Sequence, residues 1–91
     1  MTMIGSWLEI DGEHLVQTLQ DACEKLNSAE GEVVLDFSSV RRIDPSALRA
    51  MERLAGTADD KAVKVVLRGV NVDVYKVLKL VKLTPRFSFL T

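Results

Sequence analysis

Residues 35–54 read LDFSSVRRIDPSALRAMERL, and this stretch decides the fold. Its first residues end a β-branched run, EVVLDF at residues 32–37, which is typical of a largely buried strand. The next segment, Ser38–Ile43, is a polar loop. A helix start follows, because Asp44 can cap free backbone N–H groups and Pro45 suits the first helical position. Apolar side chains then recur at helical spacing, at Leu48, Met51, Leu54, Ala55 and Ala58.

Strands and helices alternate on both sides of this stretch. The periodicities predict a strand over Ile4–Ile10, a helix from Glu13 to about Asn27, a strand over Ala62–Leu67, a helix capped by Asn71 and running to Leu83, and a last strand over Arg86–Leu90. The order β-α-β-α-β-α-β favours an α/β fold, with a mostly parallel four-stranded sheet and three helices. Antiparallel pairing of the first strand stays open, because edge strands of such sheets often pair that way.

Composition restricts the classes of function. The chain has 91 residues, enough for one domain over residues 1–91 and too few for two. The formal net charge is −1, whereas nucleic-acid-binding proteins usually have an excess of basic residues, so we do not expect binding to nucleic acid. A single cysteine, Cys23, cannot form an internal disulfide and suits a reducing compartment. The first residues do not read as a signal peptide and no apolar run is long enough to span a membrane, so we expect a cytoplasmic protein without membrane insertion.

The sequence offers little for catalysis. His14 is the only histidine, and its position in the first turn of a helix is typical of a solvated surface residue. The serines have no evident histidine base, and glycine-rich phosphate loops are missing. Asp36 and Asp44 could form a carboxylate pair, but a strand-end residue and a helix cap explain them better. We therefore expect no enzyme, no metal site and no cofactor.

Two motifs resemble the STAS domain of anti-sigma-factor antagonists. The family pattern, hydrophobic-Asp-hydrophobic-Ser followed by hydrophobic-Asp-Ser-Ser/Ala-Gly-Leu, is matched by LDFS at residues 35–38 and IDPSAL at residues 43–48. Downstream, VVLRGVN at residues 65–71 and VYKVLKL at residues 74–80 look like the family's third strand and third helix. The residue pattern of this second motif is most similar to the STAS subunit of bacterial lipid-transport ABC systems. The resemblance spans roughly Ile10 to Leu90, but the first strand hairpin is shortened and the C-terminal helix is absent.

The resemblance implies a single STAS-like domain that regulates by binding protein. The leading expectation is an anti-sigma-factor antagonist that sequesters a kinase-like anti-sigma factor and so frees a sigma factor. The runner-up is a STAS subunit that docks on the ATPase of a lipid-transport ABC complex. A third alternative is a small-ligand or nucleotide-binding module, since some STAS domains have been linked to nucleotides.

The resemblance also implies a phosphorylation switch, and this chain departs from it. The family's acceptor is a Ser or Thr directly after the Asp, but here Pro45 follows Asp44 and carries no hydroxyl. Either the switch is lost and binding is constitutive, or Ser46 serves as the phosphoacceptor. We favour loss, because a shift of one residue turns the hydroxyl by about 100° around the helix.

A basic patch surrounds this helix start. Ser46, Arg49 and Arg53 share one helix face, and Arg41 and Arg42 lie in the preceding loop. Arginine favours bidentate pairing with carboxylates and is enriched at interfaces, so we expect an acidic partner surface. A merely solvated helix face is the competing interpretation. The predicted partner-binding residues are Ser39, Arg41, Arg42, Asp44, Pro45, Ser46, Arg49 and Arg53.

The third helix is apolar over most of its circumference. Its expected core stripe is Tyr75, Leu78 and Val81, with Val74 and Val77 beside it. Val72, Val77 and Leu80 are expected to be buried between the sheet and the last strand. Any of them left exposed would form a patch for a partner or a homodimer.

Overall fold

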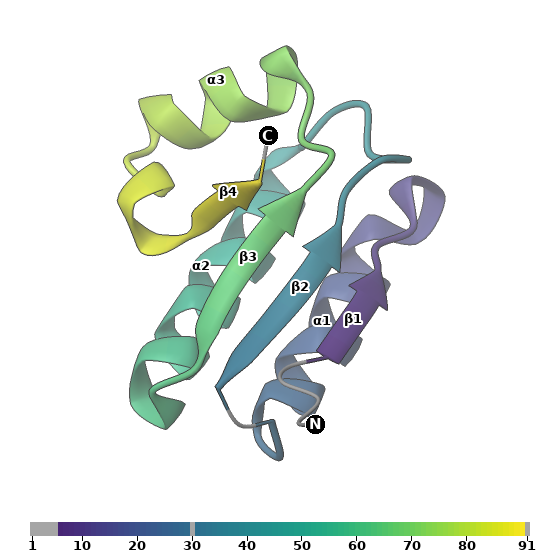
Figure 1. Cartoon of the computed structure of the whole chain (residues 1–91). Helices are drawn as coiled ribbons and strands as arrows, with labels where there is room; N and C mark the ends of the chain where they lie inside the picture. The colour runs from purple at the N-terminus through teal and green to yellow at the C-terminus, as the bar shows by residue number, and fades with distance from the viewer. Residues whose placement is uncertain (1–5, 30, 91) are drawn as a thin grey trace.

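The computed structural model describes residues 6–29 and 31–90 (Figure 1). Its elements are β1 (Ser6–Glu9), α1 (Leu15–Leu26), β2 (Glu32–Asp36), α2 (Pro45–Lys61), β3 (Lys64–Arg68), α3 (Val72–Leu80) and β4 (Ser88–Leu90). Short 3-10 turns at Gly12–His14 and Thr84–Arg86 precede α1 and β4. The predicted order of strands and helices is confirmed.

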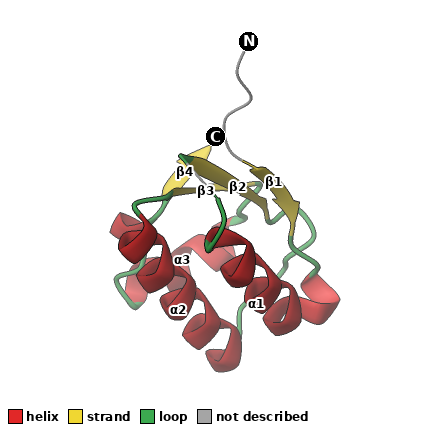
Figure 2. Ribbon diagram, turned by 90° about the horizontal axis from the view of Figure 1, so that it is seen from below, coloured by secondary structure: helices red, strands yellow, loops and turns green. Residues whose placement is uncertain are grey.

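The sheet is parallel throughout, in the order β1-β2-β3-β4. Figure 2 shows the three helices on one face of the sheet, so each crossover covers the same side. The predicted fold class is therefore confirmed. The first strand pairs parallel with β2, with Trp7 opposite Val34 and Leu8 opposite Leu35, so the antiparallel alternative does not hold.

The core lies between the sheet and the helices. In β2 and β3, Val33, Leu35, Val65 and Leu67 alternate with outward residues and join the buried cluster. The helices contribute Leu19, Ala22 and Leu26 from α1, and Ala47, Met51, Leu54, Ala55 and Ala58 from α2. Full burial of one large aliphatic side chain is worth about 1.5–3 kcal/mol. This layer therefore fixes α1 and α2 against the strands.

On the opposite face of the sheet, no helix of residues 6–29 and 31–90 is present (Figure 2). Trp7 lies there with 57% of its surface exposed, and the Arg68 guanidinium carbon is 5.1 Å from the centre of its ring. Arg68 also approaches Asp36 of the neighbouring strand, with Nη1 3.5 Å from Oδ2. Parallel sheets usually have both faces covered, so this face departs from the common pattern.

Several predicted strand boundaries shift by one or two residues. β2 ends at Asp36 rather than Phe37, and β3 begins at Lys64 rather than Ala62, because Ala62 adopts a left-handed conformation (φ 57°) that ends α2. β4 begins at Ser88, since the segment before it forms a 3-10 turn around Pro85. The first strand spans Ser6–Glu9, and Ile4 lies outside the described residues.

The third helix differs more from its prediction. It ends at Leu80, where Lys82 takes φ 63° and the Leu83 N–H donates to the carbonyl of Leu78. Its buried residues are Val74 and Leu78, whereas Tyr75 and Val81 of the predicted stripe are exposed. The exposed fractions of Val72 and Leu80 are 67% and 80%, so their expected burial is also wrong.

Candidate functional site

Asp36 shapes the loop that leaves β2. Its Oδ1 accepts hydrogen bonds from the backbone N–H (2.9 Å) and the hydroxyl of Ser38. The hydrogen bond from the Ser38 hydroxyl is the main cause that lowers the pKa of Asp36 below its ordinary value. The backbone hydrogen bond and the positive charge of Arg68 lower it further. Asp36 therefore folds the chain back at the strand end, which agrees with its interpretation as a structural strand-end residue.

Two neighbouring turns hold the loop between β2 and α2. The hydroxyl of Ser39 donates to the carbonyl of Ile10 (2.9 Å) and accepts from the N–H of Gly12 (3.2 Å), which ties the loop to the turn after β1. The side-chain amide of Asn71 donates to the carbonyls of Val40 and Arg41, both at 3.2 Å. Because Asn71 also caps α3 through its Oδ1, one residue anchors both elements. The loop is thus fixed on both sides.

The start of α2 has the predicted cap geometry. Asp44 is extended (φ −95°, ψ 172°), and its Oδ1 accepts from the N–H of Ala47 at 2.8 Å. Pro45 follows as the first helical residue. The side chains of Pro45 and Ser46 are exposed, so this helix start is accessible from solvent.

The predicted partner-binding residues divide between two hollows on either side of this helix start. Ser39, Arg41, Arg42 and Asp44 line an open hollow of about 1000 Å³, which we call the loop hollow. Ser46, Arg49 and Arg53 line a smaller one of about 420 Å³ between α1 and α2, which we call the helix groove. Pro45 lines neither, and Val16 lines both. The eight predicted residues therefore form one continuous region, which we call the α2-start surface.

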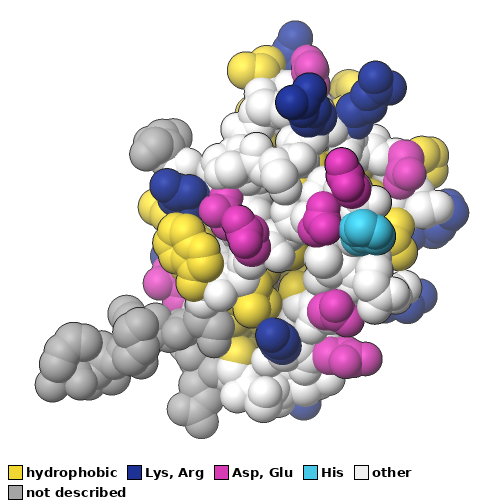
Figure 3. All heavy atoms as spheres, turned by 90° about the vertical axis from the view of Figure 1, so that its right-hand side faces the viewer, with side chains coloured by type: hydrophobic (Ala, Val, Ile, Leu, Met, Phe, Trp, Pro, Cys, Tyr) yellow, Lys and Arg dark blue, Asp and Glu magenta, His cyan; other side chains and the backbone are white. Residues whose placement is uncertain are grey.

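The far wall of the loop hollow was missed from the sequence. It is formed by Asp11, Glu13 and His14. The Nδ1 of His14 lies 3.0 Å from Oδ2 of Asp11, which raises the pKa of His14 and lowers that of Asp11. Figure 3 shows acidic side chains around the single histidine. Only a conditional signal existed in the sequence. If the first strand pairs parallel with the second, their carboxyl ends share one edge of the sheet, and the turn after β1 then lies beside the loop after β2.

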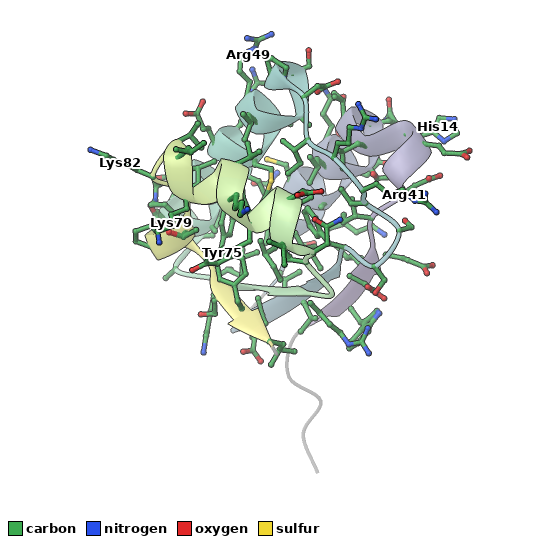
Figure 4. All side chains as sticks on the ribbon, turned by 90° about the horizontal axis from the view of Figure 1, so that it is seen from above. His14, Arg41, Arg49, Tyr75, Lys79 and Lys82 are labelled. Carbon is green, nitrogen blue, oxygen red and sulfur yellow. The ribbon has the colours of Figure 1, made fainter. Side chains whose placement is uncertain are left out.

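The α2-start surface carries arginines without internal partners. In the ranges 6–29 and 31–90, none of the observed ion pairs involves Arg41, Arg42, Arg49 or Arg53. The four side chains are exposed, and Figure 4 shows Arg41 and Arg49 directed away from the body of the protein. An unpaired guanidinium retains its full capacity to bind a carboxylate or phosphate.

The opposite wall of the helix groove comes from α1. It offers Gln20, Glu24 and Asn27 above an apolar floor that includes Leu19 and Cys23. The Sγ of Cys23 also lies 3.2 Å from the hydroxyl oxygen of Thr57 in α2. The groove therefore combines a basic wall, a polar wall and an apolar floor, which is the pattern of a surface that accommodates another chain.

Two features are absent from the part of the chain that the structure describes. Its His, Cys, Asp and Glu side chains form no group of three that could hold a metal ion. None of its helices is both long and apolar enough to cross a bilayer.

The fold is a small parallel α/β domain, and the α2-start surface is its candidate site. The sequence matches the family model described as "Mlab, STAS domain" over residues 8–87, and the chain belongs to this family. A solved structure of a candidate anti-sigma factor antagonist from Thermotoga maritima is similar, with a TM-score of 0.67 and 25% sequence identity. The match covers 96% of this chain and 74% of that one. Among curated proteins, no match is found.

Proposed function

We propose that this protein is a non-catalytic regulator of the anti-sigma-factor-antagonist type, which binds a kinase-like anti-sigma factor and so frees a sigma factor. STAS-family membership and the likeness to an antagonist structure support a regulatory role. The observation that carries the proposal is the α2-start surface, where an accessible capped helix start is flanked by four arginines that form no ion pair with another described residue.

The proposed partner presents carboxylates to this surface. Arg49 and Arg53 lie one turn apart along the wall of the helix groove, so two acidic side chains on one partner element can reach both. Arg41 and Arg42 extend the positive charge into the loop hollow. The loop is anchored through Ser39 and Asn71, so little ordering entropy is lost when a partner binds.

In this proposal, binding has no phosphorylation switch. Pro45 holds the position directly after the capping Asp44 and has no hydroxyl, and Ser46 lies one residue further along α2. A phosphoryl group on Ser46 would add about two negative charges to the basic wall of the helix groove. Incubation with the cognate kinase and ATP, followed by a phosphate-affinity gel and peptide mapping, should show no modification. A phosphopeptide containing Ser46 would establish the switch instead.

The binding proposal is tested by calorimetry with a purified kinase-like anti-sigma factor from the same organism. Reversing both charges in Arg49→Glu/Arg53→Glu should weaken the affinity by about a hundredfold or more, since each tenfold corresponds to about 1.4 kcal/mol. Lys61→Glu is the matched control, because Lys61 is also exposed on α2 but lies at its other end. Unchanged affinity of the double variant, or an equal loss in Lys61→Glu, would reject the role of the arginines.

A second candidate is docking on the ATPase of a lipid-transport ABC complex. Its support is the resemblance of residues 65–80 to the STAS subunit of such systems, which includes a glycine that the fold requires. Gly69 turns the chain at φ 73°, and an added Cβ there would lie 2.5 Å from the hydroxyl oxygen of Ser38. Permease and substrate-binding genes beside this one would support the ABC role, whereas a sigma factor and a kinase-like ATPase would support the antagonist role.

A further inference from the structure

The outward side of α3 carries exposed valine and leucine together with lysines, and no other element of the described residues covers it. Val74 and Leu78 face the core, and the opposite side carries a stripe at spacing i, i+4, i+7 and i+8. Val72 and Leu80 stand at its two ends and are the two most exposed large hydrophobic residues described. We call the stripe Val72, Lys76, Lys79 and Leu80 the α3 outer face.

Positive charge is concentrated on and around this stripe. Residues 61–91 contain seven Lys and Arg but only one acidic residue, Asp73. Lys76, Lys79 and the adjacent Lys82 are exposed, and none takes part in an ion pair within the described ranges. A surface that exposes apolar and cationic side chains together complements one that is apolar beneath an anionic layer.

We propose that the α3 outer face docks on the surface of an anionic lipid bilayer. No α3 residue lines the loop hollow, the helix groove or the third hollow beside β1, and Val72 and Leu80 are largely exposed, so both side chains project from the helix. The residues between Val70 and Lys82 include three Lys and no Arg, whereas the α2-start surface has four Arg and no Lys. Lysine acts as a point charge on a long apolar stem, which suits diffuse attraction to headgroups better than specific pairing with carboxylates.

The docked geometry follows from the stripe. Leu80 and Val72 enter the boundary between headgroups and acyl chains, and the lysine stems extend along it to reach the phosphates. Tyr75 flanks the stripe with an edge-to-face contact to Phe89, its ring centroid 5.3 Å away, and aromatic rings of this kind suit the interfacial layer. Figure 4 shows Lys79 and Lys82 on the side away from Arg41 and His14, so docking leaves the loop hollow accessible.

Vesicle sedimentation with the full chain tests this proposal. The protein should bind vesicles of phosphatidylcholine mixed with phosphatidylglycerol, not bind phosphatidylcholine alone, and dissociate as salt is raised. Lys79→Glu and Leu80→Ser should each lower partitioning by about tenfold or more. One charge near the surface is worth about fivefold and the reversal changes two charges, whereas burial of one leucine is worth about tenfold or more. Both positions are exposed, so circular dichroism should show an unchanged fold.

The matched control is Lys25→Glu, the same charge reversal on α1, away from α3. It should bind vesicles nearly as well as the native protein. Absence of binding to phosphatidylglycerol vesicles, or equal losses in Lys25→Glu and Lys79→Glu, overturns the proposal. Loss of anti-sigma-factor binding in Lys79→Glu, without any vesicle binding by the native protein, would assign the face to a protein partner instead. Because the α2-start arginines are unchanged in these variants, this proposal and the proposed function can fail separately.

Discussion

At the scale of single residues, the pairing of Asp36 with Ser38 decides how the chain leaves β2. The carboxylate is mostly buried, its side chain being 13% exposed, and it accepts two hydrogen bonds from one serine while it faces Arg68. Such bonds favour the ionised form, and this is why the pKa of Asp36 is lowered. The Asp36 carboxyl group therefore binds a proton more weakly in the folded protein than in the unfolded chain.

The pH dependence of stability should reveal this pair. A lowered folded pKa contributes stability that is complete above the ordinary value of 3.8 and is lost as pH falls through the folded pKa. Ser38→Ala removes the largest cause of the shift, so it should destabilise the protein near neutral pH and progressively less below about pH 4. Urea unfolding at a series of pH values measures the difference.

Ser39→Ala is the matched comparison for this measurement. The described hydrogen bonds of the Ser39 hydroxyl are to backbone groups of Ile10 and Gly12, which do not titrate. Loss of this hydroxyl should therefore lower the free energy of unfolding by about the same amount at every pH. Parallel pH curves for the two variants would contradict the assigned role of Asp36.

At the scale of elements, the close contact between the β1–α1 turn and the β2–α2 loop positions the site. An added Cβ at Gly12 would lie 2.2 Å from the carbonyl oxygen of Ser39, so one of the two backbones would have to move. Gly12→Ala should therefore destabilise the protein by about 1–3 kcal/mol. Gly56 lies within α2, and apart from its chain neighbours and the backbone of its own helix no atom comes within 4 Å of the place a Cβ would take. Gly56→Ala should therefore stabilise the protein by about 0.5–1 kcal/mol. Urea denaturation gives both values, and two shifts of the same sign would refute the contact argument.

The elements that were predictable are those with local signals. Helix α2 depends on such signals: Asp44 caps it, Pro45 begins it, and apolar residues recur regularly along it. Each of these features stands where the sequence predicts it. In α3, valines and leucines offer several overlapping stripes, so the sequence could not select the buried one. Packing of Val74 and Leu78 selects it, and that depends on the neighbouring strands. The meeting of Asp11 and His14 with Ser39 and Arg41 is likewise a contact between distant segments.

At the scale of the whole molecule, the fold class was predictable because strand and helix periodicities alternate through the chain. The pairing of β1 and the absence of a helix on one sheet face were not predictable, since both depend on how complete elements are arranged. Charge is also unevenly distributed, with twelve of the thirteen acidic residues in residues 1–60. The two proposed surfaces therefore differ in character as well as in position.

The open sheet face gives the protein a built-in optical reporter. Trp7 is the only tryptophan, it is more than half exposed, and the Arg68 guanidinium lies beside its ring. Its emission should already resemble that of an indole in water, so unfolding should change the emission wavelength little. Any molecule that covers β1 and β2 would instead remove water from the ring and shift the emission to the blue. Fluorescence can thus tell occupancy of this face apart from binding at α2 or α3, without a label.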